Sequence, residues 1–218
     1  LVIISFSSCT NSDKNLFEEL SSFQTGIDFR NDLKYDKNFN IFNYRNYYNG
    51  GGVGLGDINN DGLIDIFFNS NLEENKLYLN KGDFKFEDIT EIAGVTGTKS
   101  WSTGVSLADI NADGFLDIYV SNSGDIKGDN KQNELFINNG NLTFTEMASD
   151  YGLDDTGYST HAAFFDYDRD GDLDCYLLNN SYKGGFRITN VGRNQRPIRD
   201  SVGGDKLFRN DDGFFKDV

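Results

Sequence analysis

Three stretches of the chain repeat one pattern, and a repeat at a fixed spacing restricts the fold more than any other sequence feature. The stretches read GVGLGDINNDGLIDIFFNSN from Gly52, GVSLADINADGFLDIYVSNS from Gly104 and HAAFFDYDRDGDLDCYLLNN from His161. Their leading acids are 52 and 57 residues apart. A second block follows each stretch, reading NKLYLNKGDFKFEDI, NELFINNGNLTFTEM and DKLFRNDDGFFKDV. The chain is therefore a tandem array of one structural unit.

Each unit contains four short β-type runs, two around an Asp-rich loop and two around an Asn/Gly turn, which is the pattern of consecutive antiparallel hairpins. Four strands in about 50 residues are typical of a β-propeller blade. A β-sandwich is the alternative, but it gives no reason for so regular a repeat. We expect an all-β fold, a β-propeller of four-stranded antiparallel blades, with about three blades at residues 50–100, 101–157 and 158–218. Because a ring needs about 4–8 blades, we expect an N-terminal fragment of a longer protein.

Residues 10–49 precede the first repeat and contain one further match. FEELSSFQTGI, residues 17–27, is a looser relative of FEDITEIAGV from Phe86 and FTEMASDYGL from Phe144. The match predicts a lone outer strand that closes the propeller by completing a blade formed elsewhere. A short surface helix is the alternative, because LFEEL is also compatible with a helix.

The Asp-rich loops carry the chemistry. Alternate spacing lets short carboxylates converge, and the glycine at position 6 permits the turn that brings position 9 back. Positions 1, 3, 5 and 9 offer side-chain oxygens and position 7 a backbone carbonyl. The candidate ligands are Asp57, Asn59, Asp61, Leu63 and Asp65 in the first loop, Asp109, Asn111, Asp113, Phe115 and Asp117 in the second, and Asp166, Asp168, Asp170, Asp172 and Asp174 in the third.

An oxygen-only ligand set of this kind suits Ca²⁺, and we expect about three ions in this chain. Zinc would require His or Cys ligands, which the loops lack. The loops are not EF-hands, because that loop has a Glu at position 12, where this chain has Phe68, Val120 and Leu177. Three copies at one place in a structural repeat make a chance arrangement an unsatisfactory explanation.

The composition excludes several classes of protein. The chain has 218 residues, a net charge of −15, 24 Gly and a single Pro. Its 27 Asp against only 8 Glu favour turns and oxygen-ligand loops over helices, so a helical bundle is excluded. Binding to nucleic acid or to an anionic membrane surface requires clustered cations, so neither is expected as the main partner.

Residues 1–9, LVIISFSSC, resemble the end of a bacterial lipoprotein signal peptide. The run is too short to span a bilayer and ends in small residues followed by Cys9. We expect Cys9 to be lipidated, which places the protein outside the cytoplasm, at the bacterial outer membrane or cell surface or in the periplasm, with a lipid anchor as its only membrane contact. A buried strand with an incidental cysteine is one alternative, and a Cys9–Cys175 disulfide is another. Cys175 itself is expected to be an inert core thiol.

The third repeat contains a long insertion, with Lys183, Arg187, Arg193, Arg196 and Arg199 opposed only by Asp200. In so acidic a chain, the segment Lys183–Arg199 is the best candidate for contact with a partner, because long loops on rigid scaffolds often carry binding. The alternative is that this basic loop pairs with the protein's own acidic surface.

No catalytic constellation is apparent. His161 is the only histidine and has no evident nucleophile or orienting partner, so we expect a strand residue rather than a general base. Trp101 and Tyr158 occupy matching positions before an inner strand, where we expect them to pack. The paired carboxylates are already explained by metal ligation.

From Gly50 to Val218 the units resemble the FG-GAP/VCBS repeat of integrin-α-type propellers, through Asp-x-Asn/Asp-x-Asp-Gly-x-x-Asp within each unit. The companion blocks LYLNKGDFKFEDITEIAGV and LFINNGNLTFTEMASDYGL are similar to those of the cartilage acidic protein-like subgroup that carries ASPIC/UnbV domains. The resemblance implies a calcium-stabilised, extracytoplasmic, non-catalytic module for adhesion or recognition of a protein or glycan ligand. The alternative is a structural or sensory propeller attached to a downstream catalytic domain, for example one acting on polysaccharide.

Overall fold

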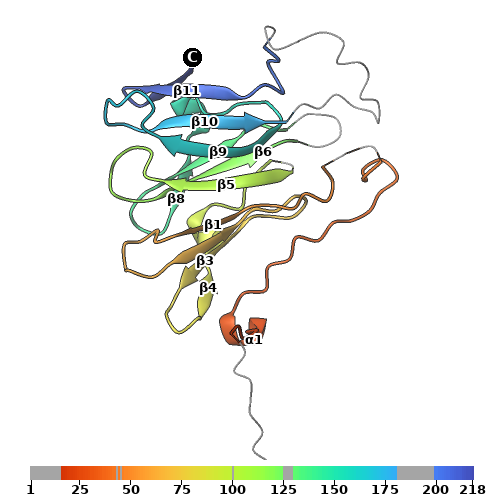
Figure 1. Cartoon of the computed structure of the whole chain (residues 1–218). Coiled ribbons are helices and arrows are strands. Elements are labelled where there is room, and N and C mark those ends of the chain that lie inside the picture. The colour runs from red at the N-terminus through yellow and green to blue at the C-terminus, as the bar shows by residue number, and fades with distance from the viewer. Residues whose placement is uncertain (1–15, 43, 45, 100, 125–129, 181–198) are drawn as a thin grey trace, which may run out of the picture.

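Three four-stranded antiparallel sheets, stacked one above another, make up the repeat region in a computed structural model (Figure 1). The structure describes residues 16–42, 44, 46–99, 101–124, 130–180 and 199–218. Sheet 1 contains β1 (Val53–Gly56), β2 (Asp65–Phe68), β3 (Lys76–Asn80) and β4 (Phe86–Asp88). Sheet 2 contains β5 (Ser102–Ala108), β6 (Asp117–Asn122), β7 (Glu134–Asn138) and β8 (Phe144–Glu146). Sheet 3 contains β9 (Ser159–Phe165), β10 (Asp174–Asn179), β11 (Lys206–Asp211) and β12 (Phe214–Asp217).

In every sheet the strands pair in chain order, each antiparallel to the next. The prediction of an all-β fold built from four-stranded antiparallel units is confirmed. The strands are rich in β-branched and aromatic residues, and the connections hold the Gly, Asn and Asp that turns require. The described helices are short: α1 (Ser22–Thr25), α2 (Thr90–Ala93) and α3 (Ala148–Tyr151). No helix in the described part of the chain has the length and apolar character to cross a bilayer.

The hydrophobic core lies between the sheets. One cluster joins sheets 1 and 2 through residues such as Phe67, Leu77 and Val120, and a second joins sheets 2 and 3 through residues such as Tyr119 and Leu177. Gly104 lets the inner strands approach, because a Cβ there would overlap the Thr160 carbonyl oxygen. Each repeat thus buries its apolar face against the next one, as neighbouring blades of a propeller do.

Trp101 packs as expected. It is 1% exposed and contacts the rings of Phe39, Tyr44 and Tyr47, which belong to the N-terminal segment. Cys175 is a free, buried thiol in β10, and burial raises its pKa. His161 lies in β9 and is exposed. Residues 1–9, with Cys9, lie outside the described residues.

Residues 17–27 contain the helix α1, but the helix covers Ser22–Thr25 and not LFEEL, the stretch at residues 16–20 on which the helical alternative was based. Phe17–Leu20 pair with no strand among the described residues. The N-terminal segment then runs from α1 beside sheet 1 to the aromatic cluster around Trp101 (Figure 1).

Candidate metal centres

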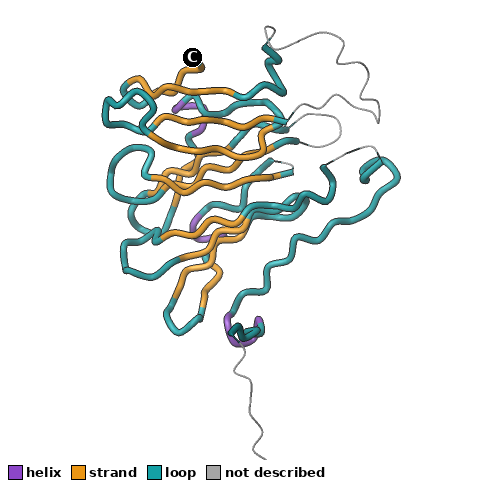
Figure 2. The backbone as a smooth tube through the Cα atoms, in the orientation of Figure 1, coloured by secondary structure: helices purple, strands orange, loops and turns teal. Residues whose placement is uncertain are grey.

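All three Asp-rich loops lie on the same edge of the stack, because each connects the first strand of a sheet to the second (left side of Figure 2). The loops are residues 57–64, 109–116 and 166–173. Loops 1 and 2 are in contact, since Asn60 Nδ2 donates to the Gly114 carbonyl at 3.0 Å. The repeat therefore places its acidic residues in one row.

Two residues in each loop have a positive φ. One is the expected glycine at position 6, where Gly62, Gly114 and Gly171 have φ of 87°, 91° and 103°. The other is position 4, where Asn60, Ala112 and Arg169 have φ of 59°, 58° and 68°. A Cβ at any of the three glycines would meet nothing within 4 Å, so backbone conformation and not space selects glycine there.

Loops 1 and 2 are held by side-chain hydrogen bonds to their own backbone. Asp57 accepts from the amides of Asp61 at 3.1 Å and Gly62 at 2.7 Å. Asp109 accepts in the same way from Asp113 at 3.0 Å and Gly114 at 2.9 Å. These Asx-type bonds point the side-chain oxygens toward the inside of the loop.

The position 5 acids take part in the same network. Asp61 accepts from Asn59 Nδ2 at 3.0 Å and from the Leu63 amide at 2.8 Å. Asp113 accepts from Asn111 Nδ2 at 2.9 Å and from the Phe115 amide at 2.9 Å. The position 7 residues Leu63 and Phe115, expected to contribute carbonyl groups, therefore also fix the position 5 side chain through their amides.

The position 9 acids are buried and fasten the loop to the sheet. Asp117 is 0% exposed and accepts from the Ile110 amide at 2.9 Å and the Asn138 amide at 2.8 Å. Asp65 makes the corresponding bonds with Ile58 and Asn80, and Asp174 with Tyr167 and Asn210. Burial raises the pKa of Asp117 to about 6 and also raises that of Asp65, against the opposing effect of these backbone bonds.

The third loop brings its carboxylates closest together. Oxygens of Asp166, Asp168 and Asp174 lie within 4.8 Å of one another, the one such acidic group among the described residues. Asp172 is not one of these three acids, but its Oδ1 is buried and has no hydrogen-bond partner in the described structure. Burial, followed by the charge of Asp170, raises the pKa of Asp172 to about 6. This oxygen-rich group, with an unpaired oxygen, has the chemistry that a hard divalent cation requires.

An asparagine at or next to the end of each third strand supports the loops, and it was not among the site residues predicted from the sequence. Asn138 Nδ2 donates to the carbonyls of Ile58 at 2.8 Å and Leu116 at 3.1 Å, so it spans the loops of two sheets. Asn80 and Asn210 donate similarly to Ile64 and Leu173. The signal was present in the sequence, because LYLN, LFIN and LFRN all end in asparagine.

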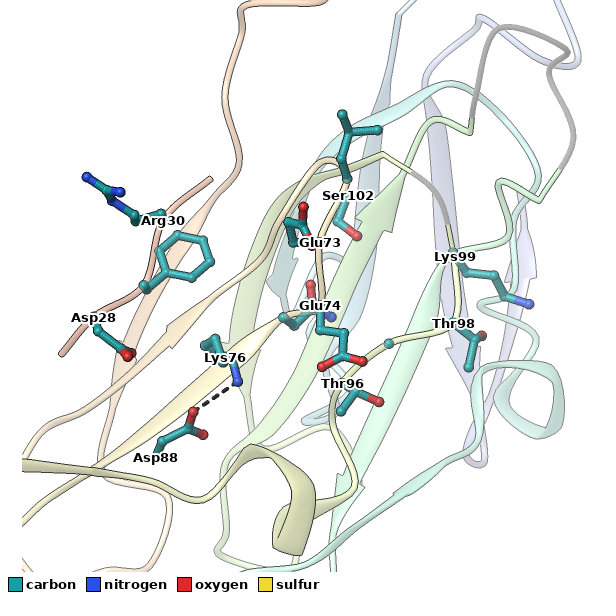
Figure 3. Close-up of a pocket in the computed structure, with 14 residues that line it drawn as sticks. Asp28, Arg30, Glu73, Glu74, Lys76, Asp88, Thr96, Thr98, Lys99 and Ser102 are labelled. Atoms are coloured by element: carbon teal, nitrogen blue, oxygen red, sulfur yellow. Dashed lines mark hydrogen bonds and ion pairs between the residues drawn. The ribbon is translucent and has the colours of Figure 1, made fainter. Parts of the chain in front are cut away.

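A cavity whose lining includes no residue of these loops lies beside sheet 1 (Figure 3). It has a volume of about 690 Å³ and is lined by the N-terminal segment at Asp28–Arg30, by the loop before β3 and by residues 96–99. Lys76 and Asp88 form an ion pair of 3.0 Å in its lining. Of the basic insertion, only Arg199 is among the described residues, and it pairs with Asp217 of the same chain.

The comparisons with known proteins agree with the repeat. A family model described as an FG-GAP-like repeat matches residues 57–120 and 123–177. Cartilage acidic protein 1 of Xenopus tropicalis is 34% identical over 157 residues, which are 69% of this chain and 23% of that protein. The Homo sapiens protein of the same name is 30% identical over 141 residues, 63% of this chain and 20% of its own length. This chain thus spans less than a quarter of the relatives it matches.

Proposed function

Because the chain belongs to the FG-GAP-like repeat family, we propose that it is a calcium-binding recognition module that acts outside the cytoplasm and has no catalytic role. The observation that carries the proposal is the acidic group of the third loop, placed where the same loop recurs in all three repeats. The similarity to the relatives supports a non-catalytic recognition module, and the oxygen atoms of the loops support calcium as the bound ion.

Calcium fits these loops because every candidate side-chain ligand is an oxygen atom. Hydrogen bonds from the loop backbone already direct several of these oxygens inward. Asp166, Asp168 and Asp174, with the unpaired oxygen of Asp172, would hold an ion in the third loop. The side chains at positions 1, 3, 5 and 9 would do so in loops 1 and 2. Bound Ca²⁺ supplies the positive charge that offsets the repulsion among these carboxylates.

Thermal melts test calcium binding. A ligand that binds only the folded state stabilises it by about 2.7 kcal/mol at a hundredfold excess over its dissociation constant. Extracellular calcium modules bind with constants on the order of 10⁻⁴–10⁻³ M, so millimolar Ca²⁺ is required. The melting temperature should be several degrees higher in Ca²⁺ than in chelator, and Mg²⁺ should raise it less. Asp113→Ala should reduce the rise, whereas Asp83→Ala, outside the loops, should not. A melt that is the same with Ca²⁺ and with chelator would reject calcium binding.

We propose a protein or glycan as the ligand of the module, with the basic segment Lys183–Arg199 as a contact. Deletion of residues 183–198 should leave the melt nearly unchanged, since loop length carries a small entropic cost, and should weaken binding to acidic partners. Arg199 pairs with Asp217 of the same chain, which at that one residue favours the alternative that the basic loop pairs with the protein's own acidic surface. A deletion that unfolds the protein would assign the segment a structural role.

We also propose that Cys9 carries a lipid anchor, which would hold the module at a membrane surface. Protein expressed with its native leader should partition into detergent, and Cys9→Ala should move it to the aqueous phase. Equal partitioning of the two forms would remove the anchor from the account.

A further inference from the structure

Loops 1 and 2 are joined by a hydrogen bond between residues whose side chains are not candidate ligands. Asn60, at position 4 of loop 1, donates from Nδ2 to the carbonyl of Gly114, at position 6 of loop 2, at 3.0 Å. Position 4 of loop 2 is Ala112, and its methyl group cannot donate a hydrogen bond. The hydrogen bonds described for loop 3 all have their partners within its own sheet. The link at position 4 is therefore specific to loops 1 and 2.

A buried side chain makes a second link between the same two loops. Asn138, which is 3% exposed at the end of β7, donates from Nδ2 to the Ile58 carbonyl of loop 1 at 2.8 Å. The same Nδ2 donates to the Leu116 carbonyl of loop 2 at 3.1 Å. The matching Asn210 donates to Leu173 of its own loop at 3.3 Å, and in the described structure it has no bond to loop 2. Both links thus join loops 1 and 2 but not loops 2 and 3.

The second link reaches the buried ligand candidates at position 9. The backbone amide of Asn138 donates to Asp117 of loop 2 at 2.8 Å. The backbone amide of Ile58 donates to Asp65 of loop 1 at 3.0 Å. Only two residues, Ile58 and Asn138, thus separate the two position 9 acids in a chain of hydrogen bonds. A shift of one acid therefore moves the backbone groups that hold the other.

The first link lies equally close to candidate ligands. Asn60 stands between Asn59 and Asp61, at positions 3 and 5 of loop 1. The amide of Gly114, whose carbonyl accepts from Asn60, donates to Asp109 at position 1 of loop 2, at 2.9 Å. An ion that fixes the ligands of loop 1 thus also fixes the residue that holds loop 2. When one loop is already ordered, ordering the other costs less conformational entropy, so the second ion binds more tightly.

We infer that the calcium sites of loops 1 and 2 bind with positive cooperativity and that the third loop binds independently. The inference rests on the proposed function, because it concerns the same ion at the same loops. Asn60 and Asn138 act as positioning residues that connect the two sites. Coupling between binding sites typically changes affinity by about 5- to 150-fold, and it is reciprocal, so either ion strengthens the binding of the other.

Charge opposes this coupling. The first ion reduces the negative charge of the loop edge, which weakens the attraction for the second ion. In about 0.15 M salt, interactions between exposed charges are screened over a distance of about 8 Å. The hydrogen bonds act through direct contact between the loops, so salt does not remove their effect. We therefore expect the hydrogen bonds to decide the sign of the coupling at this ionic strength.

Calorimetric titration of variants with Ca²⁺, in about 0.15 M salt, measures the coupling. Asp57→Asn, Asp109→Asn and Asp166→Asn each remove the position 1 carboxylate and disable loops 1, 2 and 3 respectively. Asp166→Asn alone leaves loops 1 and 2, and either further change leaves a single loop. For independent loops, the product of the pair's stepwise association constants equals the product of the single-loop constants. We expect a product at least about fivefold larger for loops 1 and 2, and a ratio of about one for loops 2 and 3 in Asp57→Asn.

Asn60→Ala, in the Asp166→Asn background, tests the first link. The loop tolerates this change, because Ala112 occupies the same position of loop 2 with φ of 58°, against 59° for Asn60. The variant should reduce the ratio for loops 1 and 2 at least about twofold, while the affinity of loop 1 alone stays the same. Arg169→Ala, at position 4 of the third loop, is the matched control and should leave the ratio unchanged.

Separate results would overturn the inference and the proposed function. A ratio of about one or less for loops 1 and 2, with calcium bound at both, would overturn the inference and leave calcium binding in place. An equally large ratio for loops 2 and 3 would also overturn it, because the coupling would then not follow the hydrogen bonds. A ratio that Asn60→Ala leaves unchanged would overturn the assignment of Asn60 as a link. Absence of binding in every form would reject the proposed calcium function, and the coupling with it.

Discussion

Position 9 of each Asp-rich loop shows how one side chain joins local and distant structure. Asp117 accepts one amide from its own loop and one from β7, 21 residues further on. The loop spacing identified this residue from sequence, but only as a ligand. Its bond to the third strand could not be predicted, because the pattern specifies the residue type and the sheet register supplies the partner. The same applies to Asp65 and Asp174.

The three loops differ at position 3, which is Asn59, Asn111 and Asp168. Because calcium affinity rises with the charge of the ligand set, we expect the third loop to bind most tightly. Asp168→Asn should weaken the tightest site, and Asn111→Asp should strengthen a weak one. Titration calorimetry with Ca²⁺ measures both. A loss of affinity with Asn111→Asp equal to that with Asp168→Asn would show that charge count does not set the order.

A buried hydroxyl distinguishes sheet 2 from sheet 1. Tyr119 donates to the Leu153 carbonyl at 3.0 Å and accepts from Asn133 Nδ2 at 2.8 Å. Phe67 stands at the matching place, and Nδ2 of the matching Asn75 is buried without a partner in the described structure. Phe67→Tyr should therefore stabilise the fold by about 1 kcal/mol, and Tyr119→Phe should destabilise it by about 1–2 kcal/mol. Urea unfolding measures both, and a marked loss with Phe67→Tyr would mean that no space exists for the hydroxyl.

Glu134 provides a pH test at a site away from the loops. It is 1% exposed, and burial raises its pKa despite hydrogen bonds from Thr98 and Asn122. The folded state therefore favours the protonated form of Glu134. Its contribution to the free energy of unfolding thus rises as the pH falls from 7 toward 4.5, the ordinary pKa of a glutamate. Relative to Glu134→Gln, the wild type should gain stability over that range in urea unfolding. A difference that is constant with pH would contradict the account.

At the scale of elements, the repeat predicted the four strands of each sheet and the hairpin order, because alternation and turn residues are local signals. The place of α1 could not be predicted, since FEELSSFQTGI is compatible with a strand or a helix and Phe17–Leu20 pair with no strand in the described part of the chain. Contacts between sheets, such as that of Asn138 with Ile58, lie beyond any local pattern.

Asn138 tests how the third strand supports the loops. The side chain is 3% exposed and makes hydrogen bonds to Ile58, Leu116 and Gly140. Asn138→Ala leaves buried carbonyls unpaired, so we expect a loss of about 1–3 kcal/mol together with weaker calcium binding in loops 1 and 2. Asn139→Ala, at an exposed neighbour, is the matched control. Equal losses from the two variants in urea unfolding would show that the contact between sheets is not what stabilises the loops.

At the scale of the whole molecule, acidic charge is gathered on one edge of a stack of apolar interfaces. The net charge is −15, and the ligand positions include three or more acids in every loop. Such concentrated charge opposes folding unless cations neutralise it. Three bound Ca²⁺ ions would change the net charge from −15 to about −9. Calcium binding, as proposed, would therefore explain the repeat, the acidic loops and the net charge together.

Equilibrium dialysis with ⁴⁵Ca²⁺ at millimolar concentration tests that property most directly, because it counts bound ions. The wild-type chain should bind about three ions, one for each loop. A variant with Asp57→Asn, Asp109→Asn and Asp166→Asn should bind almost none while retaining its strand signal in circular dichroism. A wild-type chain that binds no calcium, or a folded triple variant that binds as many ions as the wild type, would contradict the assignment of these loops as calcium sites.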